Sequence, residues 1–167
     1  MQVGDDVQIA QLNITIKPNG PGSVGVSRPI EFGAKGDAVR LFEAHYSVRE
    51  AHVETGTTIR AYFALTTDPA FLVTPPLYAA FFTDDSFYGR GIYVVRTTST
   101  VDIVKFESLI IPLWGIIRPR RQIFCAIASQ AEHSPQYVNA EFFYESVDLS
   151  LPDMASLNRK YGKYRRT

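Results

Sequence analysis

The chain has 167 residues, of which 46% are hydrophobic, 13% aromatic and 20% charged, and its formal net charge at pH 7 is zero. This composition excludes a chain that is disordered throughout, and the length suits a single domain that buries about two-thirds of its unfolded surface. The single cysteine, Cys125, excludes an intrachain disulfide framework.

Strand patterns and turns alternate over the first part of the chain. In Gln8–Ile16, apolar side chains occupy every second position from residue 10 to residue 16, which is the period of a half-buried strand. Prolines and glycines at residues 17–23 predict a turn, because proline fixes φ and glycine accepts positive φ. We expect Ile30 and Phe32 to form a short edge strand.

The next segments are mostly β-like. Residues 37–51 fit either a helix or a strand, and we favour the strand. Residues 57–65 alternate in polarity and are rich in β-branched and aromatic side chains, which predicts a second clear strand. We expect a long loop at residues 68–76, then an apolar run at 77–82 and a turn at 83–86.

The remaining β runs lie at residues 91–97, 101–106, 110–117, 122–129 and 137–149. Residues 122–129 carry apolar side chains on both faces, so we expect this strand to be covered on both sides. In total, about eight to ten strands of modest length predict an all-β fold, an antiparallel β-sandwich or barrel.

The sequence assigns no catalytic, cofactor or metal-binding residue. Residues 20–25 match the pattern G-x-G-x-x-G, but no helical pattern follows them, as a dinucleotide phosphate would require. The three histidines lack the spacing of zinc ligands, and Cys125 lies in an apolar strand, where a thiol is usually inert. Asp84 and Asp85 fall short of the roughly six to eight oxygens that calcium prefers, so we interpret them as a turn, with a calcium site shared with a neighbouring chain as the alternative.

No membrane span or secretory signal is expected either. The most apolar stretch, residues 109–117, contains Pro112 and falls short of the roughly 18 residues of a spanning helix. Asp5 and Asp6 stand where a signal peptide would carry basic side chains.

Basic residues concentrate at two places. Residues 152–167 hold five bases and one acid, about +4, which leaves residues 1–151 at about −4. We therefore divide the chain into a domain of residues 1–151 and a basic C-terminal tail of residues 152–167. We expect nucleic acid or an acidic partner to be bound by Arg118, Arg120, Arg121, Arg159, Lys160, Lys163, Arg165 and Arg166. A solvated loop and a solubilising tail are the alternatives.

Four segments carry a resemblance to a known family. They are residues 57–65 (TTIRAYFAL), 106–112 (FESLIIP), 122–127 (QIFCAI) and 140–147 (AEFFYESV), with the basic tail behind them. In this pattern the chain resembles small single jelly-roll coat proteins of icosahedral viruses. Many such coats carry a basic arm at the N-terminus, whereas the basic segment here lies at the C-terminus.

The resemblance implies a capsid protein with an eight-stranded jelly roll, no cofactor and no catalytic activity. Its partners would be copies of itself, other capsid proteins and genomic nucleic acid, and its location the virion, assembled inside the host cell. Two apolar segments are candidate contacts between subunits, because large apolar side chains are costly to expose. Their expected anchors are Phe71, Leu72, Leu77 and Trp114.

Two other functions stay open from the sequence. A carbohydrate- or receptor-binding β-sandwich would expose aromatic side chains such as Trp114 or Tyr88 at a pocket. An enzyme on a jelly-roll scaffold would need metal ligands that this sequence does not place. The strand order does not follow from the pattern, because different sandwiches share strand length and alternation.

Overall fold

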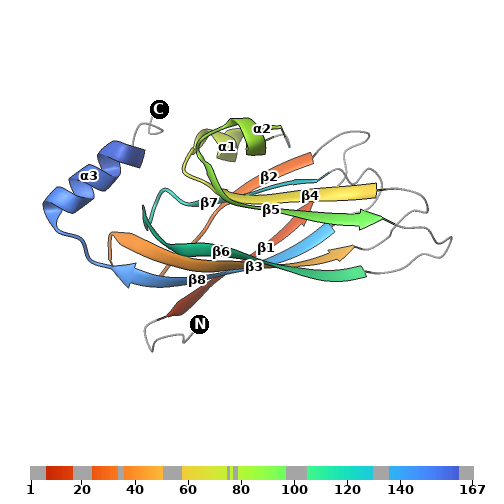
Figure 1. The fold of residues 1–167 in the computed structure, drawn as a ribbon, viewed down its shortest axis with the longest axis horizontal. Coiled ribbons are helices and arrows are strands. Elements are labelled where there is room, and N and C mark those ends of the chain that lie inside the picture. Colours follow the sequence, from red (N-terminus) through yellow and green to blue (C-terminus); the bar gives the residue numbers. More distant parts are fainter. Residues whose placement is uncertain are drawn as a thin grey trace.

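Eight strands and three helices make up the regular structure of a computed structural model that describes residues 7–16, 24–33, 36–50, 58–74, 76, 79–96, 105–129 and 136–161. The strands are β1 (Gln8–Ile16), β2 (Val24–Pro29), β3 (Ala38–Glu50), β4 (Thr58–Thr66), β5 (Phe87–Arg96), β6 (Lys105–Pro119), β7 (Phe124–Ser129) and β8 (Gln136–Val147). The short helices α1 (Ala70–Val73) and α2 (Ala80–Thr83) lie between β4 and β5, and α3 (Leu151–Tyr161) follows β8 (Figure 1).

The strands are divided between two antiparallel sheets that face each other (Figure 1). Sheet A has the order β1-β8-β3-β6, and sheet B has the order β2-β7-β4-β5. This order is that of a jelly roll, in which two Greek keys fold into a pair of packed sheets. The predicted all-β sandwich is therefore confirmed, and the pairing supplies the strand order that the sequence pattern left open.

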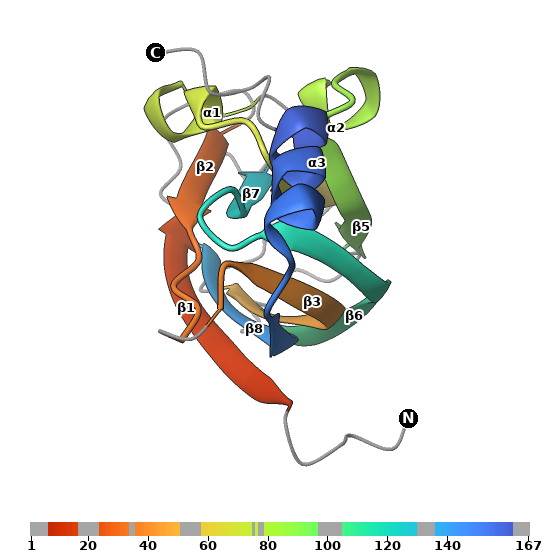
Figure 2. The same ribbon diagram turned by 90° about the vertical axis from the view of Figure 1, so that its left-hand side faces the viewer.

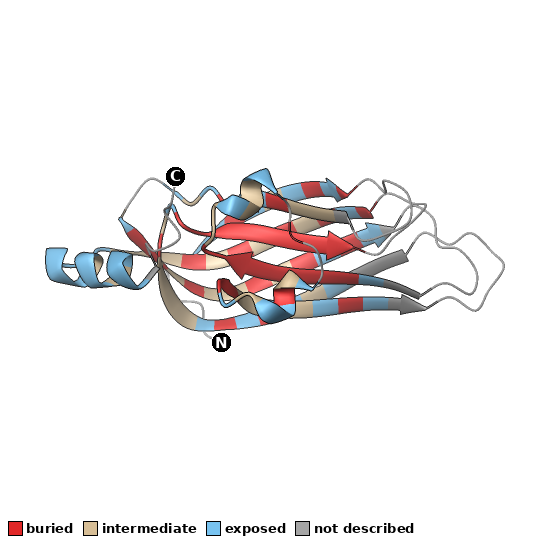
Figure 3. Ribbon diagram, turned by 90° about the horizontal axis from the view of Figure 1, so that it is seen from above, coloured by how far each residue is buried: buried red, intermediate tan, exposed pale blue. Residues whose placement is uncertain are grey.

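The main core lies between the two sheets and is built from their inward-facing side chains. Tyr46 on β3 lies 4.6 Å from Phe63 on β4 and 5.9 Å from Phe142 on β8, measured between ring centroids. All three side chains are buried. Burying one side chain of this size stabilises the fold by roughly 1.5–3 kcal/mol. Figure 3 shows the buried positions alternating with more exposed ones along the outer strands.

Sheet B is also covered over part of its outer face, because the β4–β5 connection folds back over it. Phe81 of α2 stacks on Phe87 with ring centroids 4.8 Å apart, and Phe71 of α1 lies 4.9 Å from the same ring. The connection extends to β2, where a Cβ on Gly25 would lie 2.1 Å from the carbonyl oxygen of Pro76. Glycine is the residue that permits this close approach. All six residues of β7 are buried, which confirms the predicted two-sided covering.

Other predictions are confirmed or corrected strand by strand. The strands expected near β1, β3, β4 and β8 are confirmed. The edge strand expected at Ile30 and Phe32 is wrong. β2 ends at the pair Pro29–Phe124, where its partner β7 begins, and the backbone N–H of Ile30 donates to the carbonyl of Ile123 at 3.4 Å outside any strand. The separate runs expected at residues 101–106 and 110–117 are also wrong, since one strand, β6, covers their described part. The turns expected at residues 17–23 and 98–100 lie outside the described residues.

Candidate assembly and binding surfaces

An insertion at the centre of β6 turns Trp114 away from the sheet. Leu41 pairs with Ile116 and Glu43 pairs with Pro112. Between these two pairs β3 has one residue and β6 has three, so β6 bulges out. Trp114 has a φ of 58° and the glycine after it a φ of 67°. A left-handed backbone is strained for a bulky L-residue. The Trp114 side chain is 85% exposed.

A hollow of about 400 Å³ lies beside Trp114, between the edge strands β5 and β6. Its lining residues are Tyr88, Gly89, Arg90, Ile111, Pro112, Leu113, Trp114, Ile116 and Arg118. The guanidinium carbon of Arg118 lies 4.7 Å from the centre of the Tyr88 ring, a cation–π contact. The same guanidinium donates to the carbonyl of Ile117 at 2.9 Å.

The three arginines at the end of β6 have different surroundings. Arg118 stacks on Tyr88, as described above. Arg120 donates from its side chain to the carbonyl of Gly33, and its backbone N–H donates to the carbonyl of Asp37 at 3.0 Å. These contacts tie the loop after β6 to the segment that connects β2 and β3. Arg121 is exposed.

The C-terminal segment, which the charge pattern predicts as a tail, begins as the helix α3. Ser150 caps it, because the Ser150 hydroxyl donates to the Asp153 carboxylate and accepts from the Asp153 N–H at 3.4 Å. Figure 2 looks onto α3 at one end of the sandwich, where the helix contacts β6. Arg159 and Lys160 are exposed in its last turn, whereas Lys163, Arg165 and Arg166 lie outside the described residues.

One side of α3 carries three apolar residues that remain partly or fully exposed. Leu151, Met154 and Leu157 follow one another at a spacing of three residues and therefore share a face of the helix. Leu151 is 87% exposed and the other two are half-buried. An isolated helix of this length is marginal in water, so packing of this face would stabilise it.

A second apolar surface, the sheet B patch, consists of the exposed side chains of Phe82, Ile92 and Val94. A hollow of about 160 Å³ opens within it. The lining residues are Tyr62, Phe81, Phe82, Arg90, Gly91 and Ile92. Two predicted contact residues, Phe71 and Leu72, lie half-buried on α1, and a third, Leu77, is outside the described residues.

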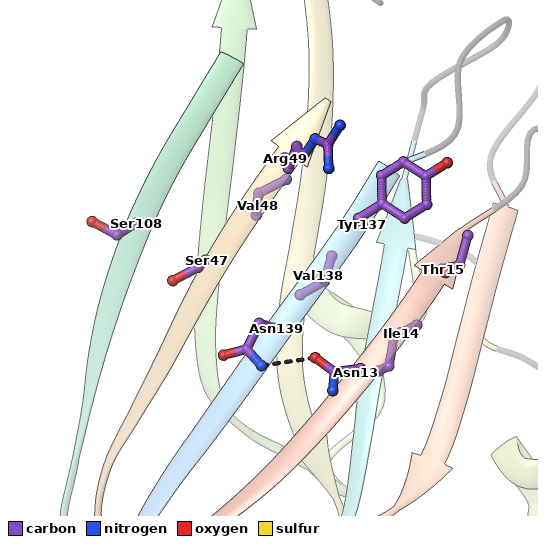
Figure 4. A pocket seen from close by; sticks show the side chains of 10 residues that line it. All are labelled: Asn13, Ile14, Thr15, Ser47, Val48, Arg49, Ser108, Tyr137, Val138 and Asn139. Carbon is purple, nitrogen blue, oxygen red and sulfur yellow. Dashed lines mark hydrogen bonds between the residues drawn. The ribbon is translucent and has the colours of Figure 1, made fainter. Parts of the chain in front are cut away.

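The outer face of sheet A is open and holds a third surface, the sheet A trough, with a volume of about 570 Å³ (Figure 4). Its floor is a row of small polar side chains, one from each strand. In the ladder Asn139 lies between Asn13 and Ser47, and Ser47 pairs on its other side with Ser108. The neighbouring rows of outward-facing residues carry larger side chains, such as Tyr137. The trough therefore runs across the strands.

The described part of the chain offers few side chains suited to catalysis or metal binding. Burial raises the pKa of the Cys125 thiol from 9.0 to about 12, although a contact of 3.9 Å with the Tyr46 hydroxyl lowers it slightly. The thiol is therefore protonated and weakly nucleophilic at neutral pH. Asp84 accepts from the backbone N–H of Ser86 at 2.8 Å, as an Asx turn does. The described residues include no group of three or more His, Cys, Asp or Glu side chains that could hold a metal.

The sequence missed the trough, because its floor comes from four strands whose order and register are not visible in the sequence. The bulge at Trp114 had one local signal, the glycine that follows it inside a β run, since such glycines often mark a bulge. The start of α3 also had a signal in Ser150 and Asp153, which stand at the spacing of a capping box. Among the described helices, none has the length and apolar character that crossing a membrane requires.

Comparisons with known proteins find likenesses among solved structures. No protein-family model matches the chain, and no curated protein does. A solved structure from Desmodium yellow mottle tymovirus is similar to 90% of this chain and 94% of its own, with a TM-score of 0.40 and 9% sequence identity. A likeness of this size assigns no function.

Proposed function

We propose that this chain is a structural subunit of a virion shell, without catalytic activity, that assembles with copies of itself inside the host cell. The observation that carries the proposal is Trp114, a large apolar side chain held 85% exposed by a left-handed backbone. Strained backbone tends to cluster at functional positions, and an exposed tryptophan is costly in water. A partner that covers Trp114 would remove this cost.

Several contact surfaces support a subunit with more than one neighbour. Trp114 lies at the edge formed by β5 and β6, the sheet B patch lies beside α2, and the apolar face of α3 lies at one end of the sandwich. A closed shell needs complementary patches on different sides of each subunit. The jelly roll itself is an architecture that capsid proteins use, although lectins and cupins use it as well.

The basic C-terminal segment has a role of its own in the proposal. Arg159 and Lys160 are exposed at the end of α3, and three further bases follow in the sequence. The rest of the chain carries an excess of acid. We therefore assign to this segment contact with genomic nucleic acid or with the acidic surface of a neighbouring subunit.

Light scattering of the purified chain over a range of concentration and salt tests the assembly. We expect large, uniform particles, and we expect Trp114→Ser to shift the protein to small species without loss of folded structure. Ile9→Ser, at the opposite edge of sheet A, is a matched control because Ile9 is also exposed. A concentration-independent monomer at physiological salt would refute the proposal.

Removal of the chain after Asn158 tests the basic residues separately, because it keeps the apolar face of α3. Loss of co-purifying nucleic acid from intact particles would indicate genome binding, and loss of the particles would indicate a contact between subunits. Particles that keep both their size and their nucleic acid would show that the segment has neither role.

A further inference from the structure

The floor of the sheet A trough offers hydrogen-bond donors and acceptors that carry no formal charge. Nδ2 of Asn139 donates to Oδ1 of Asn13 at 2.7 Å, which orients both amides (Figure 4). This bond leaves the Asn13 amide NH₂ group and the Asn139 carbonyl oxygen for a ligand. Ser47 and Ser108 add two hydroxyls, each of which can donate and accept. Sugar hydroxyls require this mixture, because each of them also donates and accepts.

An aromatic ring stands at one side of this floor. Tyr137 lies two residues before Asn139 on β8. It faces the same side of sheet A and is 41% exposed. The guanidinium of Arg49 lies 5.6 Å from the centre of the Tyr137 ring. A tyrosine at a surface presents a rigid apolar body with a polar tip, which suits the C–H face of a sugar ring.

We infer that the sheet A trough binds a neutral glycan, with Tyr137 packing against a sugar ring and the row of Asn13, Asn139, Ser47 and Ser108 binding its hydroxyls. The site is separate from Trp114 and Tyr88, the aromatic residues that the sequence indicates for carbohydrate binding. It adds a binding activity to the proposed shell subunit and does not depend on assembly.

The composition of the trough favours a glycan over two other classes of ligand. The ten residues that line it include one cation, Arg49. Single-stranded nucleic acid requires a positively charged groove in addition to aromatic rings. Interfaces between proteins are depleted in serine relative to the rest of the surface, whereas two serines lie in this floor.

A panel of immobilised galactose-, mannose- and N-acetylglucosamine-terminated oligosaccharides, probed with the full chain, tests this inference. The best binder is then titrated as a free oligosaccharide by calorimetry. We expect Ser47→Tyr, which fills the floor, and Tyr137→Ala, which removes the ring, each to weaken binding by roughly tenfold or more. Ile9→Ser changes a similarly exposed position that lines neither the trough nor a proposed contact between subunits, and it should leave the affinity unchanged.

Ser108→Tyr provides a second filling variant on the edge strand β6, in case Ser47→Tyr is poorly folded by circular dichroism. Three outcomes would overturn the inference. They are no binding to any glycan of the panel, glycan binding that the filling variants leave unchanged, and a preference for a single-stranded oligonucleotide that the same variants abolish. Because the titration is run on whichever species light scattering finds, failure of shell assembly leaves its result interpretable.

Discussion

The outer faces of the two sheets differ in what covers them. On sheet B, Ala64, Ala126 and Ala128 face outward and are buried under the aromatic rings of the β4–β5 connection. On sheet A, the side chains of the trough floor are also small, but they are polar and open to solvent. Small apolar side chains therefore allow a second layer to pack closely, whereas small polar ones leave a groove.

This difference also explains the contrast between β7 and β8, which are both interior strands of their sheets. Buried and less buried positions alternate over most of β8, whereas β7 is buried throughout. The uniformly apolar composition of a strand thus reports a covering on its second face rather than its position within the sheet.

The largest expected effect comes from removing the centre of the sheet B cover. Phe81 is buried and stacks on Phe87, so Phe81→Ala should lower the free energy of unfolding by about 3–5 kcal/mol, measured by urea denaturation. Phe82→Ala is the matched control, because this adjacent ring in the same helix is 65% exposed. Equal losses in the two variants would show that the cover does not stabilise the fold.

The next effect comes from the burial of β7 and depends on pH. Cys125 has a pKa of about 12 in the folded chain, against 9.0 for the free thiol. Below pH 9 the thiol is neutral in both states and its contribution to stability is complete. As pH rises from there toward 12, mainly the unfolded chain ionises, so the free energy of unfolding should fall by roughly 1 kcal/mol per pH unit. Burial raises the pKa of Tyr46 well above 10.0, which acts in the same direction.

Urea denaturation from about pH 8 to about pH 11 measures this slope. Cys125→Ala should remove from this slope the contribution of the thiol. The variant should also be less stable at every pH, because it leaves a cavity. Identical slopes in the two proteins would mean that the thiol is not held neutral by burial.

A smaller effect is expected where the cover meets β2. The Cβ of Gly25→Ala would stand 2.1 Å from the carbonyl oxygen of Pro76, and a backbone atom cannot turn aside as a flexible side chain can. We expect a loss of about 1–3 kcal/mol. Ser47→Ala, on the open face of sheet A, serves as a control that should change the stability by less than about 0.5 kcal/mol. An unchanged free energy of unfolding for Gly25→Ala would mean that the β4–β5 connection shifts to make room without loss of stability.

Local alternation was sufficient to predict β1, β4 and β8, because each pattern is complete within its own strand. The start of β2 could not be found in this way. Gly25 weakens the β pattern there, and the reason for a glycine is a contact with Pro76, far along the chain. The all-β class follows from the number of strands and turns, whereas the jelly-roll order depends on which strands pair.

The candidate surfaces were less predictable than the fold, because each depends on register. Trp114 is apolar and follows a β run, so the sequence alone fits a core position as well as a contact between subunits. Its exposure results from the extra length of β6 opposite Phe42. Asn13 and Asn139 are equally uninformative alone, and they form a site only when β1 pairs with β8 in the observed register.

The smallest effect is expected from Asn139→Ala in the floor of the trough. The Asn139–Asn13 hydrogen bond joins two side chains that water can reach, so the loss should stay within about 0.5 kcal/mol of the wild-type free energy of unfolding. Ala126→Asn is the reciprocal change on the covered face and should cost much more, because the β4–β5 connection excludes water there. A loss well above 1 kcal/mol for Asn139→Ala would assign the polar row to stability. A near-neutral result would agree with the glycan-binding role inferred for the row, which requires no contribution to folding.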